Sequence, residues 1–342
     1  MSSGPWKRGA GCGWASPPVS EDGHDRRHAF GCGFPDNKRC DVIAKSRRSL
    51  LASIPTICLA GKLAAQGSTR PDFTEAPEYR IFDAPPDTHI LSRQDVTVDG
   101  SGYRLFLAVP KATAPADGWP SLWMLDGNAV FDRIGASDLV SQPGLAVIGI
   151  GYPVDQIFDT TARALDYTPV SRVPDPEAGR GRATGGADSF RTRLLGPLRD
   201  AVEKRVSIDP ARRVLWGHSY GGLFTLHCLL SEPHAFAGWA PTSPSSGFGG
   251  NVLQHLSAGA PLLEPGKIAP VHIMLGDSEY RRGTEPPAVP QPSPDTMALA
   301  KLLEQREDLD VRVTVLKGLG HGQTFAASFP QALDLAANLP GN

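Results

Sequence analysis

The sequence predicts an α/β fold in which helices cover both faces of a mostly parallel central sheet. From about residue 71, strand-like and helix-like segments alternate along the chain, a pattern typical of right-handed crossovers between parallel strands. Several strand-like segments are continuous apolar runs, as expected of strands covered on both faces. A chain of 342 residues, of which 40% are hydrophobic and 20% charged, is long enough to bury one large core.

The first predicted elements form a hairpin at the edge of this sheet. Residues 94–98 and 103–109 alternate apolar and polar side chains, and the turn signal Asp99-Gly100-Ser101-Gly102 joins them. The apolar runs 121–125 and 145–150 then predict buried central strands. Leucines and a valine at helical spacing predict a helix over residues 189–206.

The second half of the chain continues the alternation of strands with helices. The expected strands are 213–216, 237–240, 271–275 and 311–316, and the expected helices are 220–230, 295–305 and 326–338. In sheets of this kind, ligands bind beyond the carboxyl ends of the strands.

Residues 151–188 interrupt this rhythm. They have no apolar period and are rich in proline and glycine, and they follow a predicted central strand. A connection of this length inside a compact domain is usually functional, so we expect a loop that covers the active site.

The front of the chain is expected to lie outside the folded domain, which spans residues 71–342. Residues 1–41 are rich in Gly, Ser, Pro, Arg and His and predict a disordered segment or an over-extended start. In residues 42–66, the pair Arg47-Arg48 precedes an apolar stretch too short to span a bilayer. This pattern is typical of an export signal of the twin-arginine kind and predicts a periplasmic protein with no stable membrane span in its mature form.

Composition argues against several classes of partner and cofactor. The formal net charge is −2 and the charges are interspersed, so no basic surface for nucleic acid or anionic lipid is expected. The folded domain has a single cysteine, Cys228, which can form neither an internal disulfide nor a thiolate metal site. We therefore expect no metal and no cofactor, and a monomer or weak oligomer.

The segment 214–223 contains the strongest chemical signal. Ser219 lies between Gly217 and Gly221, after a buried strand and before an amphipathic helix, with a third glycine, Gly222, for close packing. A nucleophilic serine at such a sharp strand-to-helix turn needs a strained backbone and no bulky neighbours, which glycines provide. The pattern predicts Ser219 as a catalytic nucleophile on an α/β-hydrolase fold.

A base is expected later in the chain, after the last strand. His321 lies there between Gly320 and Gly322, in a loop that can carry an imidazole to Ser219. The acid is expected after the strand 271–275, where Glu279 and Asp277 are both candidates. Glu279 is preferred for its longer reach, although a Ser–His dyad without a placed acid stays open.

An oxyanion requires two hydrogen-bond donors. The backbone N–H of Tyr220, the residue after the nucleophile, is the first candidate. The second is the N–H of Asn128, in the turn that follows the strand 121–125. Asp126 in the same turn is expected to form the turn and not to serve as the triad acid.

These motifs together resemble the esterase D group of α/β-hydrolases, and within it most closely the periplasmic enterobactin and salmochelin siderophore esterases. The resemblance spans residues 75–338 and rests on segments that keep their order along the chain. They are 125–128 with Phe131, 149–152, Arg163 with 166–169, 217–222, 243–245 and 320–321.

This resemblance implies that the protein hydrolyses the serine esters of a triscatecholate trilactone. It implies Ser219 and His321 as the catalytic pair, and Arg163 and Tyr167 as parts of the substrate pocket. Arg163 is expected either to contact an anionic ferric catecholate or to form a structural ion pair with Asp166. Phe248 replaces the tryptophans that family members often carry and is the candidate for catecholate stacking.

Two other functions share these residues. A general carboxylesterase, acting on feruloyl or acylated-sugar esters, would have the same nucleophile and base. A protein that kept the fold but lost turnover would be a binding protein for the same kind of small ester. Labelling of Ser219 and a comparison of substrates distinguish these functions.

Overall fold

The computed structural model describes residues 75–174, 178–280 and 287–340. The predictions for residues 1–41 and 42–66 lie outside the described residues. Residues from Gly67 onward form a unit of their own, which holds all the described elements.

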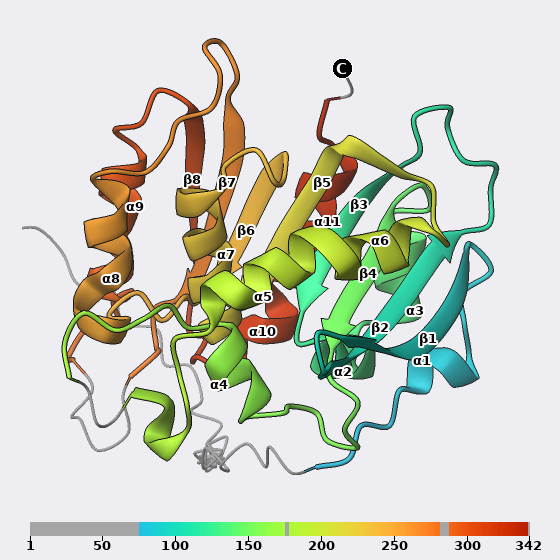
Figure 1. The fold of residues 1–342 in the computed structure, drawn as a ribbon, viewed down its shortest axis with the longest axis horizontal. Helices are drawn as coiled ribbons and strands as arrows, with labels where there is room; N and C mark the ends of the chain where they lie inside the picture. The colour runs from blue at the N-terminus through green and yellow to red at the C-terminus, as the bar shows by residue number, and fades with distance from the viewer. Residues whose placement is uncertain (1–74, 175–177, 281–286, 341–342) are drawn as a thin grey trace, which may run out of the picture. The chain divides into compact units, whose positions relative to one another are not determined.

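An eight-stranded sheet in the order β1-β2-β4-β3-β5-β6-β7-β8 forms the centre of this unit (Figure 1). The hairpin of β1 (His89–Val98) and β2 (Ser101–Pro110) lies at one edge and is antiparallel, and β2 also pairs antiparallel with β4 (Ala146–Gly151). All other pairs are parallel. The remaining strands are β3 (Trp119–Leu125), β5 (Ile208–His218), β6 (Gly238–Thr242), β7 (Ala269–Gly276) and β8 (Leu309–Leu316). The predicted fold class, strand set and edge hairpin are confirmed.

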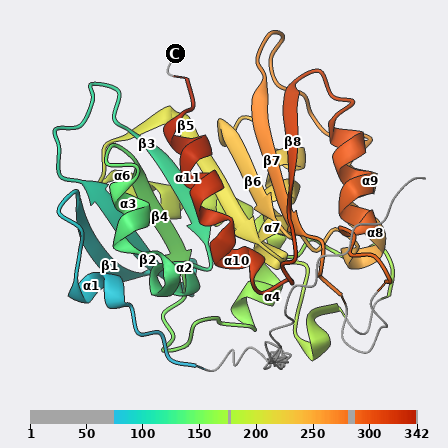
Figure 2. The same cartoon turned by 180° about the vertical axis from the view of Figure 1, so that it is seen from behind.

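Helices cover both faces of the sheet (Figures 1 and 2). Apolar side chains of one face pack with those of α5 (Ala187–Arg193), α6 (Arg199–Glu203), α7 (Tyr220–Ser231), α8 (Phe248–Ser257) and α9 (Pro294–Leu303). Those of the other face pack with α1 (Arg80–Asp83), α2 (Gly127–Arg133), α3 (Ala136–Val140), α10 (Thr324–Ala327) and α11 (Phe329–Ala337). All strands from β3 to β7 are buried along almost their whole length, except the early part of β5, which agrees with the continuous apolar runs.

The predicted helix over residues 189–206 is wrong as a single element. A π-type turn, Leu194–Leu198, separates α5 from α6, and Gly196 inside it has non-helical dihedral angles (φ −115°, ψ −106°). Pro197 explains the break, because proline lacks an N–H and disfavours helical geometry in the residue before it. The predicted helix 326–338 is likewise divided at Ser328, with Pro330 in the first turn of α11.

The segment 151–188 is less irregular than the sequence suggests. Its described residues include the short helix α4 (Ala162–Asp166) and a 3₁₀ turn, Ala178–Gly181. In the middle of this segment, the backbone N–H of Arg172 donates a hydrogen bond to the carbonyl oxygen of Gly249, at the start of α8 (3.1 Å). The helices α2, α4 and α10 lie along the edge of the sheet where the parallel strands end (Figure 1).

Candidate active site

Ser219 occupies a strained turn between β5 and α7. Its dihedral angles are φ 60° and ψ −115°, a conformation that is costly for a residue with a side chain. The turn is possible because its neighbours lack side chains: a Cβ on Gly217 would lie 2.3 Å from the carbonyl oxygen of Gly221. On the helix side, the crowded position is Gly222, where a Cβ would lie 2.8 Å from the carbonyl oxygen of Thr242. A Cβ on Gly221 would make only ordinary contacts, the nearest at 3.5 Å.

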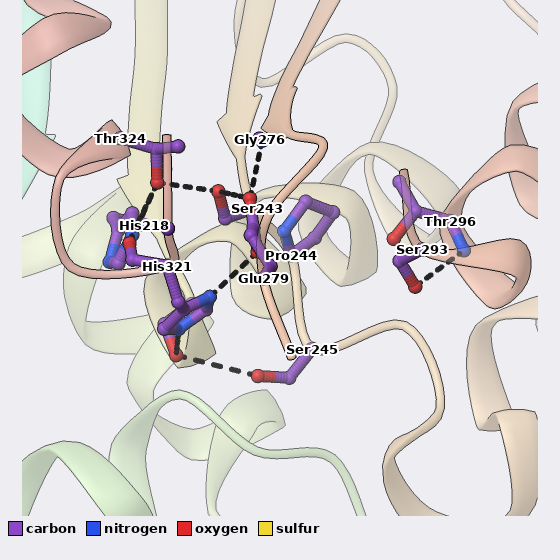
Figure 3. A network of polar contacts seen from close by, with 12 residues as sticks. His218, Ser243, Pro244, Ser245, Gly276, Glu279, Ser293, Thr296, His321 and Thr324 are labelled. Carbon is purple, nitrogen blue, oxygen red and sulfur yellow. Dashed lines mark hydrogen bonds and ion pairs between the residues drawn. The ribbon is translucent and has the colours of Figure 1, made fainter. Parts of the chain in front are cut away.

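Ser219, His321 and Glu279 form a continuous hydrogen-bonded row. The Nε2 atom of His321 lies 3.0 Å from the Oγ of Ser219, and its Nδ1 atom lies 2.8 Å from an Oε atom of Glu279. Glu279 follows β7, and His321 lies in the loop that follows β8, so the three side chains converge from three strand ends. Figure 3 shows the imidazole of His321 directed at the Glu279 carboxylate. This geometry is that of a nucleophile, a base and an acid that orients the base.

Glu279 is held as a carboxylate. Burial alone would raise its pKa, but hydrogen bonds from His321, Ser243 and the Gly276 amide outweigh burial and leave the pKa of Glu279 below its ordinary value. The Ser243 hydroxyl donates to the second Oε atom at 2.6 Å, and the backbone N–H of Gly276 donates to the same oxygen.

Asp277, the alternative acid, does not contact the imidazole. Its carboxylate accepts the N–H of Gly318 (2.6 Å) and the hydroxyl of Ser278 (3.1 Å). It therefore ties the loop after β7 to the loop that carries His321. The structure thus gives the two carboxylates separate tasks.

The hydroxyl groups of Ser243 and Thr324, to which the sequence analysis gives no role, connect the acid to the backbone of the base. Thr324 donates to the carbonyl oxygen of His321 (2.7 Å), and its hydroxyl lies 2.7 Å from that of Ser243 (Figure 3). The Nε2 atom of His218 donates to the same His321 carbonyl at 2.8 Å. Burial and the neighbouring His321 lower the pKa of His218 well below its usual range, so His218 stays neutral. These groups fix the backbone of His321.

The two predicted oxyanion donors both lie in the first turn of a helix. Tyr220 is the first residue of α7, and Asn128 is the second residue of α2, so neither N–H has a carbonyl partner within its own helix. The side chain of Asn128 is anchored to the end of β4: its Nδ2 donates to the Tyr152 carbonyl (3.0 Å) and its Oδ1 accepts the Tyr152 N–H (2.9 Å). Whether these amides bind an oxyanion stays a prediction.

The predicted ion pair of Arg163 with Asp166 is wrong. Arg163 forms a bidentate pair with Asp126 at 2.8 and 2.9 Å. Asp166 instead accepts hydrogen bonds from Tyr103 (3.0 Å) and Tyr152 (3.2 Å). The sequence could not indicate this partner, because Asp126 lies 37 residues before Arg163 and follows a different strand.

The other two predicted substrate residues are largely covered. Tyr167 is fully buried, its hydroxyl accepts the N–H of Asp126 (3.2 Å), and its ring lies beside the Arg163 guanidinium. Phe248 is 8% exposed and packs edge to face on Tyr220 with 5.8 Å between ring centroids. A substrate contact for either residue stays a prediction.

The described residues contain no cluster of three His, Cys, Asp or Glu side chains that could hold a metal ion. No helix within the same residues has the length and apolar character needed to cross a membrane.

Comparison with known proteins identifies relatives over most of the chain. The Esterase family model matches residues 100–315. An apo-salmochelin esterase of Escherichia coli O6:H1 is 36% identical over 296 residues, which cover 81% of this chain and 88% of the relative. The ferri-bacillibactin esterase BesA of Bacillus subtilis is 33% identical over 155 residues, which cover 42% of this chain and 53% of that protein.

Solved structures agree with the sequence relatives. The enterobactin and salmochelin hydrolase IroE matches with a TM-score of 0.60 and 33% identity, over 75% of this chain and 99% of that one. A structure of the same hydrolase in complex with DFP, an inhibitor of serine hydrolases, matches with a TM-score of 0.62. These findings confirm the resemblance inferred from the sequence motifs. The chain belongs to the Esterase family and is a serine ester hydrolase.

Proposed function

We propose that this enzyme hydrolyses the ester bonds of a catecholate siderophore of the enterobactin trilactone type, through an acyl-enzyme on Ser219. The observation that carries the proposal is the near full-length similarity to an esterase of apo-salmochelin, at 36% identity over 81% of this chain. The hydrogen-bonded row of Ser219, His321 and Glu279 supports the chemistry.

In the first half of the reaction, the Ser219 Oγ attacks the ester carbonyl carbon while the His321 Nε2 accepts the hydroxyl proton. The carbonyl oxygen gains negative charge, which the N–H groups of Tyr220 and Asn128 stabilise. Glu279 accepts the Nδ1–H of His321 and stabilises the imidazolium. When the tetrahedral intermediate collapses, the ester C–O bond breaks and the imidazolium returns the proton to the departing alkoxide.

In the second half, a water molecule takes the place of the alcohol. The His321 Nε2 accepts a proton from this water as its oxygen attacks the acyl carbon. The same two amides stabilise the second tetrahedral intermediate. Its collapse breaks the bond to Ser219, the proton returns to the Ser219 Oγ, and the free carboxylic acid leaves.

The base and the acid of the site differ in their exposure to solvent. The side chain of His321 is 47% exposed, whereas that of Glu279 behind it is 10% exposed. The imidazole is thus accessible to a substrate from solvent, whereas the acid is largely shielded from water. We further propose that Phe248, next to Tyr220, offers an aromatic edge to a catechol ring, and that the enzyme acts in the periplasm after export directed by residues 42–66.

The proposal is tested by following substrate cleavage with purified protein. Apo-enterobactin and ferric enterobactin are incubated with the wild-type enzyme and with Ser219→Ala, and the linear fragments are separated by chromatography. We expect cleavage by the wild type and none above background by the variant. An aryl ester measured in parallel is the comparison substrate.

Each result has a distinct meaning. Rapid aryl-ester hydrolysis without siderophore cleavage would overturn the substrate and leave a general carboxylesterase. Folded wild-type protein that a fluorophosphonate does not label at Ser219 would overturn the catalytic proposal and leave a binding protein.

A further inference from the structure

We propose that Arg163 is a positioning residue that joins the two halves of the oxyanion hole and neutralises the carboxylate of Asp126 behind it. This inference rests on the proposed acyl-enzyme chemistry of Ser219. It replaces direct substrate binding as the main task of Arg163.

The first half of the hole is the turn into α2. Asp126 is the residue before this helix and has a left-handed backbone conformation (φ 56°), and Asn128 follows two residues later. The Asp126 carboxylate is held by the guanidinium of Arg163 through two parallel hydrogen bonds, 2.8 and 2.9 Å long. The Asp126 side chain is only 2% exposed, so Arg163 fixes a buried group in the same turn as the candidate donor.

The second half of the hole is the elbow at Ser219. The Nη2 atom of Arg163 also approaches the carbonyl oxygen of His218 at 3.4 Å, one residue before the nucleophile. On the other side of the elbow, a Cβ on Gly221 would lie 3.6 Å from an Asp126 Oδ atom, so the carboxylate borders the first turn of α7. One buried ion pair therefore contacts both backbone segments that carry the candidate donors.

The guanidinium is held in place from several directions. Its carbon lies 5.5 Å from the ring centroid of Phe158 and 5.6 Å from those of Tyr167 and Tyr220. Contacts of this kind stabilise a cation over an aromatic face. With a side chain 13% exposed and already paired, Arg163 has little of its guanidinium left for a substrate.

Charge gives the pair a second effect on the reaction. An unpaired Asp126 carboxylate would face the two helix N-termini that are meant to stabilise a negative oxygen, and like charges repel strongly where water is excluded. Arg163 removes that repulsion. Loss of Arg163 alone should therefore harm catalysis more than loss of both charges together.

The test compares Arg163→Met, Asp126→Asn and the double variant with a neutral aryl ester, an anionic aryl ester and a fluorophosphonate. We expect Arg163→Met to lower kcat by about 10- to 100-fold for both esters, less than the roughly 10²- to 10³-fold loss seen when an oxyanion donor itself is removed, with KM changed less than about threefold. Inactivation by the fluorophosphonate should slow in parallel. The double variant should have a kcat at least about fivefold higher than that of Arg163→Met, because it no longer contains the unpaired charge of Asp126.

Arg306 provides a matched control. It forms a similar buried bidentate pair with Asp308 (2.9 and 2.6 Å) and also donates to a backbone carbonyl, that of Pro261 (2.8 Å). This pair precedes β8 and so lies at the opposite ends of the strands from Ser219. Arg306→Met should lower stability but leave kcat within about twofold, because it touches neither oxyanion segment.

Several results would overturn the proposal. One is a rise in KM confined to the anionic ester with kcat unchanged, which would make Arg163 a substrate-binding residue. Another is a double variant as impaired as Arg163→Met. If Arg163→Met does not fold, the variants Asp126→Asn and Arg163→Lys are measured instead. A lower kcat at constant KM in either variant supports the positioning role of Arg163, and a wild-type kcat in both rejects it. Wild-type protein inert to the fluorophosphonate would instead refute the proposed function itself.

Discussion

At the scale of single residues, the candidate site separates two neighbouring carboxylates by their partners. Glu279 and Asp277 follow the same strand, yet only Glu279 contacts the His321 imidazole, at 2.8 Å. Asp277 accepts the backbone N–H of Gly318 and so acts on the loop instead of the base. Their different contacts predict different kinetic effects.

We expect Glu279→Gln to lower kcat by about 10²- to 10⁴-fold, since an amide neither fixes the imidazole tautomer nor stabilises the imidazolium. Asp277→Asn keeps an oxygen that can accept the Gly318 N–H and should stay within about threefold of the wild type. Steady-state kinetics with an aryl ester measure both. Equal losses in the two variants would show that the contact between His321 and Glu279 has no special role.

At the scale of elements, the glycines at the turn from β5 into α7 are needed because they leave room for neighbouring backbone atoms, more than because they are flexible. Gly217 and Gly222 face backbone atoms closer than a Cβ can approach, whereas Gly221 faces ordinary contacts. The sequence analysis expects room at Gly221 and close packing at Gly222, and the structure places the steric requirement on the helix side at Gly222 alone. The difference arises because β6 and its Thr242 carbonyl lie beside Gly222.

This difference can be measured with three alanine variants. Gly217→Ala and Gly222→Ala should each lower the free energy of unfolding by about 2–3 kcal/mol or more, because the added methyl group overlaps backbone. Gly221→Ala should be neutral or stabilising by up to about 1 kcal/mol, since alanine favours a helix. Urea titrations followed by circular dichroism give these values. A Gly221→Ala variant as unstable as Gly222→Ala would contradict this packing argument.

Much of the fold and the core of the site follow from local sequence signals. Continuous apolar runs marked the central strands, and the turn signal at residues 99–102 marked the edge hairpin, because each depends on neighbouring residues alone. Ser219 and His321 are predicted in the same way, since each lies between glycines directly after a predicted strand.

What the sequence did not predict depends on contacts between distant segments. The helices α2 and α4 have seven and five residues, too few for an apolar period to show. The partner of Arg163 depends on which strand ends lie side by side, and the strand order was not predicted. The sequence favours Glu279 over Asp277 by side-chain reach alone, because the contact itself depends on the path of a loop that carries no periodic signal.

At the scale of the whole molecule, the unit that holds the described elements has ion pairs at both ends of its strands. Arg163 and Asp126 lie where the strands end, near Ser219, and Arg306 and Asp308 precede β8. Hydrogen bonding to Arg306 lowers the pKa of Asp308 below its ordinary value. Because the pKa is lower in the folded state, the pair contributes stability above the unfolded pKa and loses it as the pH falls through the folded pKa.

The lowered pKa of Asp308 predicts how the stability of an Arg306 variant changes with pH. Arg306→Met leaves the Asp308 carboxylate without its cation, held by the Leu263 N–H, and should cost about 1–2 kcal/mol at pH 7. The difference in the free energy of unfolding between wild type and variant should stay constant down to about pH 5. It should decrease below about pH 4, as Asp308 becomes protonated. Thermal unfolding across this range measures the difference. A difference that widens on acidification would show that the pair does not lower the pKa of Asp308.

The distance along the chain between the nucleophile and its base has a consequence for biosynthesis. Ser219 precedes His321 by 102 residues, and the loop of His321 is tied to β7 through Asp277. A nascent chain that has already formed the elbow still lacks its proton acceptor until β7 and β8 have been translated and paired. Ester cleavage therefore requires a chain that extends through His321, and translation products that end before this residue remain inert.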